Sequence, residues 1–90
     1  MGIIPFPAAP LPAHSALRIV TEVLADVLHT FAAAITPGQR LAEDLRLDHL
    51  DVWRIGEALY EACGSDVPDE AIAACRTVQD LAELLRAGVH

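Results

Sequence analysis

The chain has 90 residues, which suits one small domain with a modest core. Its formal charge of −7, from 13 acidic and six basic residues, argues against binding to nucleic-acid phosphates or anionic membranes and favours basic partners. Only 4% of the residues are aromatic although 53% are hydrophobic, so Ala, Leu, Val and Ile must fill the core.

Residues 1–14 form a proline-rich segment. Its prolines are Pro5, Pro7, Pro10 and Pro12. Because proline fixes φ and lacks a backbone donor, we predict an extended tail here and no helix. The segment lacks the basic start of a signal peptide, and no stretch of the chain has the ~20 apolar residues of a membrane helix. We therefore predict a cytoplasmic protein. We also predict one domain over 15–87 and a frayed end at 88–90.

A first helix is predicted from about Ser15, its N-cap, to about Ala33. Apolar residues recur at helical spacing along one side of this segment. They are Leu17, Val20, Leu24, Val27, Leu28 and Phe31. His29 falls on the polar side, which indicates a solvated surface residue. The dipeptide Pro37-Gly38 then predicts a turn.

The connection that follows this turn runs to Leu47 and is long for a compact domain. We predict that Leu41, Leu45 and Leu47 anchor it in the core. A second helix is predicted to open at Asp48, whose carboxylate accepts from the amide of Asp51 or a neighbour. It should run to about Cys63, with Gly64 in the left-handed conformation that ends many helices.

The second helix has two apolar groups of side chains when it is projected at about 100° per residue. The predicted core stripe is Val52, Ile55, Leu59, Ala62 and Cys63. The opposite group is Leu50, Trp53, Glu57 and Tyr60. Large apolar residues outside the core stripe indicate a surface that meets a partner, or one that the tail or the long connection covers. The sequence leaves both readings open.

Two further helices complete an all-α fold. A short third helix is predicted to start within 67–70, capped by Asp69, and to reach about Ala74. Thr77 and Asp80 form a capping box for the last helix. Its buried face is Val78, Leu81, Leu84 and Leu85. The pattern predicts a bundle of three main helices and one short helix, with no strand.

The two cysteines, Cys63 and Cys75, are too few and too far apart for a zinc site. A single disulfide between them stays open, although cytoplasmic chains usually keep their thiols reduced. We predict two small buried thiols.

Residues 41–51 read Leu-Ala-Glu-Asp-Leu-Arg-Leu-Asp-His-Leu-Asp. This run resembles the stretch of acyl carrier proteins in which Asp-Ser-Leu-Asp/Glu opens the second helix, and the resemblance covers roughly 17–86. It implies an acyl-carrier-protein-like four-helix bundle of fatty-acid or polyketide metabolism, with a long loop between the first two helices. It also implies that the acidic second helix docks on the basic surface of an acyl-chain synthase, transferase or related enzyme. We expect a monomer.

Two residues depart from the family pattern. Arg46 stands where the family commonly has glycine, and His49 stands where the family's serine carries phosphopantetheine. Imidazole has no hydroxyl, and Ser15 and Ser65 lie far from this position in the sequence. We therefore predict that His49 is unmodified and that the protein has no cofactor.

The main functional hypothesis is a partner-binding module without cargo. Its predicted contact residues are Asp48, Leu50, Asp51, Trp53, Glu57 and Tyr60. The alternative is a carrier with an unconventional attachment site, or one that binds acyl chains non-covalently in space left by the small Cys63 and Cys75. An enzyme or a metal site at His49 is not expected, because the sequence has no phosphate loop, metal motif or nucleophile elbow.

Overall fold

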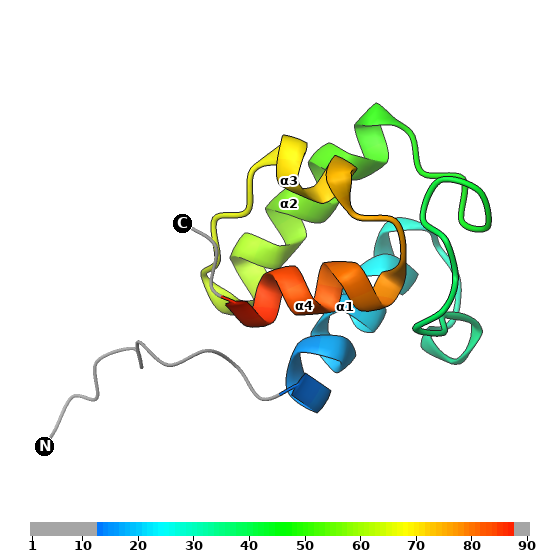
Figure 1. Ribbon diagram of the computed structural model, residues 1–90, viewed down its shortest axis with the longest axis horizontal. Coiled ribbons are helices and arrows are strands. Elements are labelled where there is room, and N and C mark those ends of the chain that lie inside the picture. The colour runs from blue at the N-terminus through cyan, green and yellow to red at the C-terminus, as the bar shows by residue number, and fades with distance from the viewer. Residues whose placement is uncertain (1–12, 88–90) are drawn as a thin grey trace, which may run out of the picture.

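The computed structural model describes residues 13–87, which form four α-helices and one short 3₁₀ helix (Figure 1). Within this range no strand forms, and a single isolated bridge pairs Arg40 with Thr77. The predicted all-α architecture, with three main helices and one short helix, is confirmed. Residues 1–12 and 88–90, which hold most of the predicted tail and the predicted frayed end, lie outside the described range.

Helix α1 (Ala13–Val27) begins directly after the last proline of the N-terminal segment. The helix thus begins two residues before the predicted N-cap. Ser15 therefore lies inside the first turn, and its predicted role as N-cap is wrong. The predicted tail correspondingly loses Ala13 and His14 to the helix.

Helix α1 ends at Val27, well before the predicted end at Ala33. The backbone N–H of Thr30 donates to the Ala25 carbonyl at 2.8 Å, and His29 has a φ of 56°. These features form a Schellman-type end with histidine in the left-handed position that glycine usually takes. The chain then turns into the 3₁₀ helix η1 (Ala32–Ala34), and Phe31, the last residue of the predicted apolar stripe, is 81% exposed.

The long connection between α1 and α2 is fixed at its middle to the start of α4. The backbone N–H of Leu41 donates to the Arg76 carbonyl at 2.8 Å, and that of Val78 donates to the Gln39 carbonyl at 3.0 Å. Leu41 is buried, while Leu45 and Leu47 are partly buried against the core. The prediction of a connection anchored by these three leucines is confirmed.

Helix α2 (His49–Cys63) has the start and the end that the sequence predicts. The Asp48 carboxylate accepts from the amide of Asp51 at 2.9 Å, and the Asp51 carboxylate accepts from the amide of Asp48 at 3.2 Å. The hydrogen bond from the Asp51 amide holds the pKa of Asp48 below its ordinary value of 3.8. Gly64 ends the helix with a φ of 73°.

The core face of α2 is close to the prediction. Ile55 and Leu59 are buried, and Val52 and Cys63 are partly buried against the core. The predicted core residue Ala62 is exposed, whereas Ala58 packs against the core. The core face is therefore shifted slightly around the helix, as the packing of α1 and α3 on α2 sets its orientation.

Helices α3 (Asp69–Ala74) and α4 (Val78–Ala87) follow after short turns. Pro68 occupies the N-cap position of α3 without a side-chain hydrogen bond, so Asp69 is the first helical residue and the predicted cap is wrong by one position. At α4 the Asp80 amide donates to Thr77 Oγ1 at 3.1 Å, and the Thr77 amide donates to the Asp80 carboxylate at 3.2 Å. This confirms the predicted capping box.

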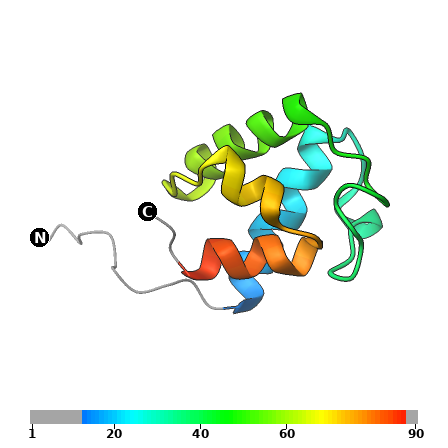
Figure 2. The same cartoon turned by 45° about the horizontal axis from the view of Figure 1, so that its top comes forward.

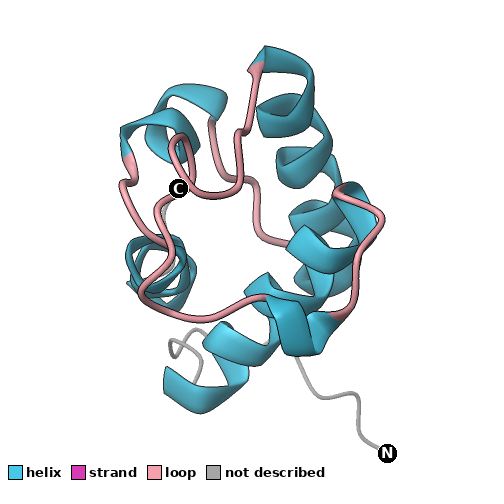
Figure 3. Ribbon diagram, turned by 90° about the vertical axis from the view of Figure 1, so that its right-hand side faces the viewer, coloured by secondary structure: helices cyan, strands magenta, loops and turns pink. Residues whose placement is uncertain are grey.

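The helices pack around one core. Helix α1 packs against both α4 and α2, and α3 packs against α2. Figure 2 shows α3 between α2 and α4 in that view, and Figure 3 views the bundle from the end where the long connection lies. The large side chains that are fully buried come from all four α-helices. They are Val20, Leu24, Ile55, Leu59, Ile72, Val78 and Leu81.

Both cysteines have free thiols and are only partly buried, so the prediction of buried thiols overstates their burial. The Cys63 thiol donates to the Leu59 carbonyl at 3.3 Å, and the Cys75 thiol to the Ala71 carbonyl at 3.4 Å. Partial burial, together with the nearby Asp80 carboxylate, raises the pKa of the Cys75 thiol. No helix within the described residues is long and apolar enough to cross a membrane.

Arg46, just before α2, has a φ of 58°, a conformation that costs a residue with a Cβ roughly 1–2 kcal/mol. We expect Arg46→Gly to raise the free energy of unfolding by about 0.5–1 kcal/mol, because the lost strain exceeds the added freedom of the unfolded chain. Urea denaturation measures this change. Arg76→Gly is the matched control, since Arg76 has no positive φ, and it should destabilise the protein. Equal effects of the two changes would contradict the argument.

The capping carboxylate of Asp48 makes a pH-dependent contribution to stability. Since the folded-state pKa is lower than the unfolded one, this contribution is complete above the unfolded value near 3.8 and is lost as pH falls through the folded pKa. Asp48→Asn keeps a good cap without the charge, so its stability should fall less than that of the wild type between pH 5 and pH 3. Asp48→Ala should be less stable at every pH. Identical acid profiles for wild type and Asp48→Asn, measured by circular dichroism, would exclude this role.

Candidate functional site at helix α2

His49 is the first residue of α2 and is exposed. Asp48 precedes it, and Leu50 and Asp51 follow in the first turn of the helix. The carboxylates of Asp48 and Asp51 each accept a hydrogen bond from the other residue's backbone amide. They are therefore used in capping the helix, and the imidazole of His49 has no hydrogen bond to any residue within 13–87.

The surroundings of His49 do not assemble a catalytic or metal-binding constellation within the described residues. No group of three or more His, Cys, Asp or Glu side chains is arranged there to hold a metal ion. General base catalysis also requires a reacting group within hydrogen-bond reach and a further residue to orient the base. Neither is present next to His49 among residues 13–87, so the geometry fits a solvated side chain.

The hydroxyl groups of Ser15, Ser65 and Thr77 lie away from His49 in the fold. Ser65 follows the C-cap of α2, and a helix of 15 residues is about 22 Å long, so Ser65 lies at the far end from His49. Ser15 is in the first turn of α1. The Thr77 hydroxyl accepts from the Asp80 amide and thereby caps α4. The fold thus brings neither serine nor Thr77 to the start of α2.

The predicted partner-binding residues of α2 lie on its surface. Leu50, Trp53 and Tyr60 are 52%, 49% and 59% exposed, and Glu57 is also exposed. The long connection therefore does not cover these side chains, and this reading of the apolar group is wrong. The other reading, cover by the proline-rich tail, concerns residues 1–12, which are outside the described range.

A groove of about 450 Å³ runs along one side of this surface, between α2 and the start of α3. Trp53, Glu57, Tyr60 and Glu61 line it from α2. Asp66, Val67 and Asp69 line it from the segment that leads into α3. Sequence reasoning did not assign Asp66 and Asp69 to this surface, because only the packing of α3 on α2 brings them beside it.

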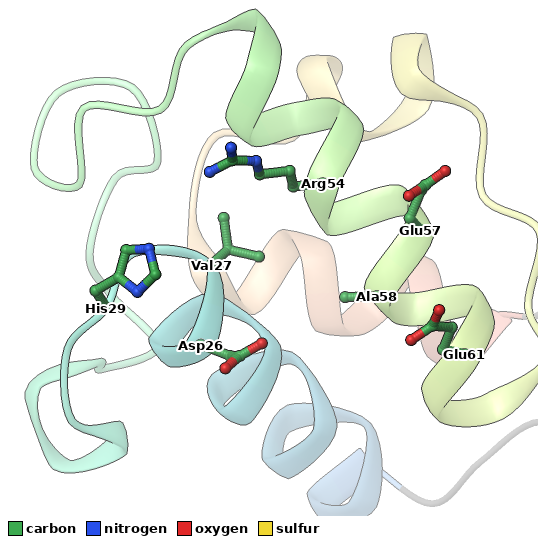
Figure 4. Close-up of a pocket in the computed structure, with 7 residues that line it drawn as sticks. All are labelled: Asp26, Val27, His29, Arg54, Glu57, Ala58 and Glu61. Atoms are coloured by element: carbon green, nitrogen blue, oxygen red, sulfur yellow. The ribbon is translucent and has the colours of Figure 1, made fainter.

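A second groove of about 270 Å³ lies on the other side of Glu57 and Glu61, between α2 and the end of α1. Figure 4 shows Asp26 and His29 approaching from the end of α1, opposite Arg54, Glu57 and Glu61 of α2. Arg54 is the one basic residue of α2. Each groove thus has at least three carboxylates in its lining, and the two grooves share the acidic ridge formed by Glu57 and Glu61.

Comparison with known proteins identifies the scaffold. Residues 18–85 match the family described as "Phosphopantetheine attachment site". The chain is 35% identical over 66 residues to an acyl carrier protein of Syntrophobacter fumaroxidans, covering 73% of this chain and 82% of that protein. It is also 35% identical over 69 residues to an acyl carrier protein of Thermosynechococcus vestitus, covering 77% and 85%. An acyl carrier protein of Rickettsia typhi is 33% identical over 67 residues, covering 74% and 78%.

The family match spans the four α-helices almost completely, from the second turn of α1 to the last turn of α4. The relatives are similar over most of their own length, so the likeness concerns the whole domain. Acyl carrier proteins are carriers and not enzymes, which agrees with the prediction that this chain is not an enzyme. The chain therefore belongs to the phosphopantetheine-attachment family of carrier proteins, together with the acyl carrier proteins.

Proposed function

We propose that this protein uses the carrier scaffold to bind partner proteins and does not carry a phosphopantetheine arm. The observation that carries the proposal is the exposed His49 at the first position of α2, where the resemblance to acyl carrier proteins puts the attachment serine. No residue from Leu45 to Asp51 has a hydroxyl group. The phosphopantetheine of the family would therefore be absent here.

The chemistry of attachment explains the role of the missing hydroxyl. The transferase that loads a carrier needs an oxygen nucleophile, which attacks a phosphate of coenzyme A and forms a stable phosphodiester. An imidazole nitrogen would give a phosphoramidate, which is labile. His49 lies at the surface, so its chemistry, and not its burial, is what distinguishes it from a serine.

The partner surface in this proposal is the exposed face of α2. Asp48, Asp51 and Glu57 supply negative charge along the helix, and Leu50, Trp53 and Tyr60 supply apolar area beside it. Such a face fits the basic surface of an acyl-chain synthase, transferase or related enzyme of fatty-acid or polyketide-type metabolism, with charge attraction guiding the encounter. The cytoplasmic location and the monomeric state stay predictions from the sequence.

The alternative of non-covalent acyl binding receives less support from the two grooves beside α2. An acyl chain needs an apolar cavity, whereas each groove is lined by at least three carboxylates. Cys63 and Cys75 both pack against the core and are partly buried. An unconventional attachment residue is tested directly by the mass of the protein.

One prediction concerns attachment of the phosphopantetheine arm. After incubation with coenzyme A and a broad-specificity phosphopantetheinyl transferase, we expect the intact mass of the wild type to stay unchanged. His49→Ser should gain the mass of one phosphopantetheine arm, because it restores a hydroxyl at the start of α2. Circular dichroism of this variant checks that the fold is retained.

Two results would contradict this part of the proposal. A mass gain by the wild type, in the reaction or in protein isolated from its native host, would mean that the chain carries the arm at another residue. Failure of both proteins to react would mean that the missing hydroxyl is not what prevents attachment.

Another prediction concerns the exposed face of α2 that is proposed to bind a partner. The double change Glu57→Lys with Glu61→Lys should weaken binding to a basic synthase or transferase of the native host at least about tenfold, because it places like charges opposite each other. Surface plasmon resonance measures the affinity. These two residues are preferred to Asp51, since Asp51 also caps α2 and its loss would affect folding.

The matched control for each single reversal, Glu57→Lys or Glu61→Lys, is Glu83→Lys, which changes the net charge by the same amount on α4, away from α2. Glu83 pairs with Arg86 at the surface, and such exposed pairs contribute little to stability. Equal affinities for the control and for both single reversals would show that the partner does not use α2.

A further inference from the structure

The groove between α2 and the start of α3 combines aromatic side chains with carboxylates from two segments of the chain. Trp53 and Tyr60, two helical turns apart, both line this groove, and they are 49% and 59% exposed. Four carboxylates line the same groove, and no basic residue does. They are Glu57, Glu61, Asp66 and Asp69.

The start of α3 lies close to Gly56 of α2. A Cβ atom at Gly56 would lie 3.4 Å from Oδ1 of Asp69 and 3.6 Å from the Val67 carbonyl oxygen. The carboxylate of Asp69 therefore lies beside α2, where it lines the same groove as Trp53. Acids from two separate segments thus converge on one aromatic-lined cleft.

Among residues 13–87, no side chain forms an ion pair with the four carboxylates of the groove. Within residues 13–87 the ion pairs join Arg18 to Glu22, Arg40 to Glu43 and Asp44, and Arg86 to Glu83. None of the acids of the groove takes part in these pairs. Unpaired carboxylates beside aromatic rings attract a cation, because each ring face is also negative.

From this arrangement we infer that the groove between α2 and α3 docks an arginine-bearing segment of a partner protein, and that it prefers arginine to lysine. The planar guanidinium group stacks on an aromatic ring while its N–H groups bond carboxylates in pairs. The compact ammonium group of lysine bonds carboxylates but stacks less well. This inference rests on the proposed partner-binding function and specifies the chemistry of the partner.

Other occupants of the groove fit less well. A second copy of this chain carries the same charge of −7, so two copies repel each other. The N-terminal residues 1–12 contain neither arginine nor lysine, so they supply no guanidinium group. Charge complementarity therefore favours a different, basic protein.

The test uses two capped peptides that differ only in having two arginines or two lysines at the same positions, titrated into the full chain at low salt. Trp53 is the only tryptophan, so its fluorescence reports binding at the groove. We expect the arginine peptide to change the Trp53 emission and to bind roughly two- to fivefold more tightly, the ratio expected from an exposed cation–π contact. Equal affinities of the two peptides would overturn the inference.

Variants test whether the preference for the arginine peptide arises in the groove. Their affinities for both peptides are measured by calorimetry. Trp53→Leu should bring the arginine-to-lysine ratio close to one, whereas Leu50→Ala, which removes an exposed apolar residue outside the groove, should leave it unchanged. Glu61→Gln with Asp66→Gln should weaken both peptides. An unchanged ratio in Trp53→Leu, or a Trp53 emission that depends on protein concentration without peptide, would also overturn the inference.

The failure of this inference differs from failure of the proposed function. If the two peptides bind equally while the Glu57 and Glu61 reversals still weaken the enzyme partner, α2 binds partners but the groove does not select arginine. If those reversals have no effect on the partner, the partner-binding function itself is wrong, and with it the inference.

Discussion

The structure depends on the burial of medium-sized apolar side chains from all four α-helices in one core. Leu24, Ile55 and Leu81 are fully buried, and truncating such a residue to alanine typically costs about 2–5 kcal/mol. No polar or charged side chain is buried among the described residues. All 13 acidic residues of the chain fall within that range, so the core forces the whole excess of negative charge to the surface.

Helix α2 places part of this negative charge beside its exposed aromatic residues. Its core face is fixed by Ile55 and Leu59, and the geometry of the helix then leaves Trp53, Glu57 and Tyr60 exposed. Helices α1 and α3 both pack against α2. Helix α1 brings Asp26 up to the shared ridge of Glu57 and Glu61, and the segment that leads into α3 brings Asp66 and Asp69. The same packing that buries the core therefore produces two acid-lined grooves, one of which also has aromatic walls.

The start of α2 is stabilised by residues other than His49. Asp48 and Asp51 cap the helix reciprocally, while the histidine side chain lies in solvent. The scaffold can therefore change the residue at this position without losing its second helix. This separation of folding from attachment explains how a chain can keep the carrier fold, and the acidic face beside it, in the proposed absence of the arm.

The sequence by itself determined the features that depend on a few neighbouring residues. The cap at Asp48, the end at Gly64 and the capping box of Thr77 were predictable because their hydrogen bonds span at most four residues. The end of α1 was missed, since histidine only occasionally adopts the left-handed conformation found at His29. Tertiary structure alone decided the exposure of Ala62 and the convergence of Asp66 and Asp69 on Trp53. These depend on how α1 and α3 pack against α2, which no local spacing in the sequence encodes.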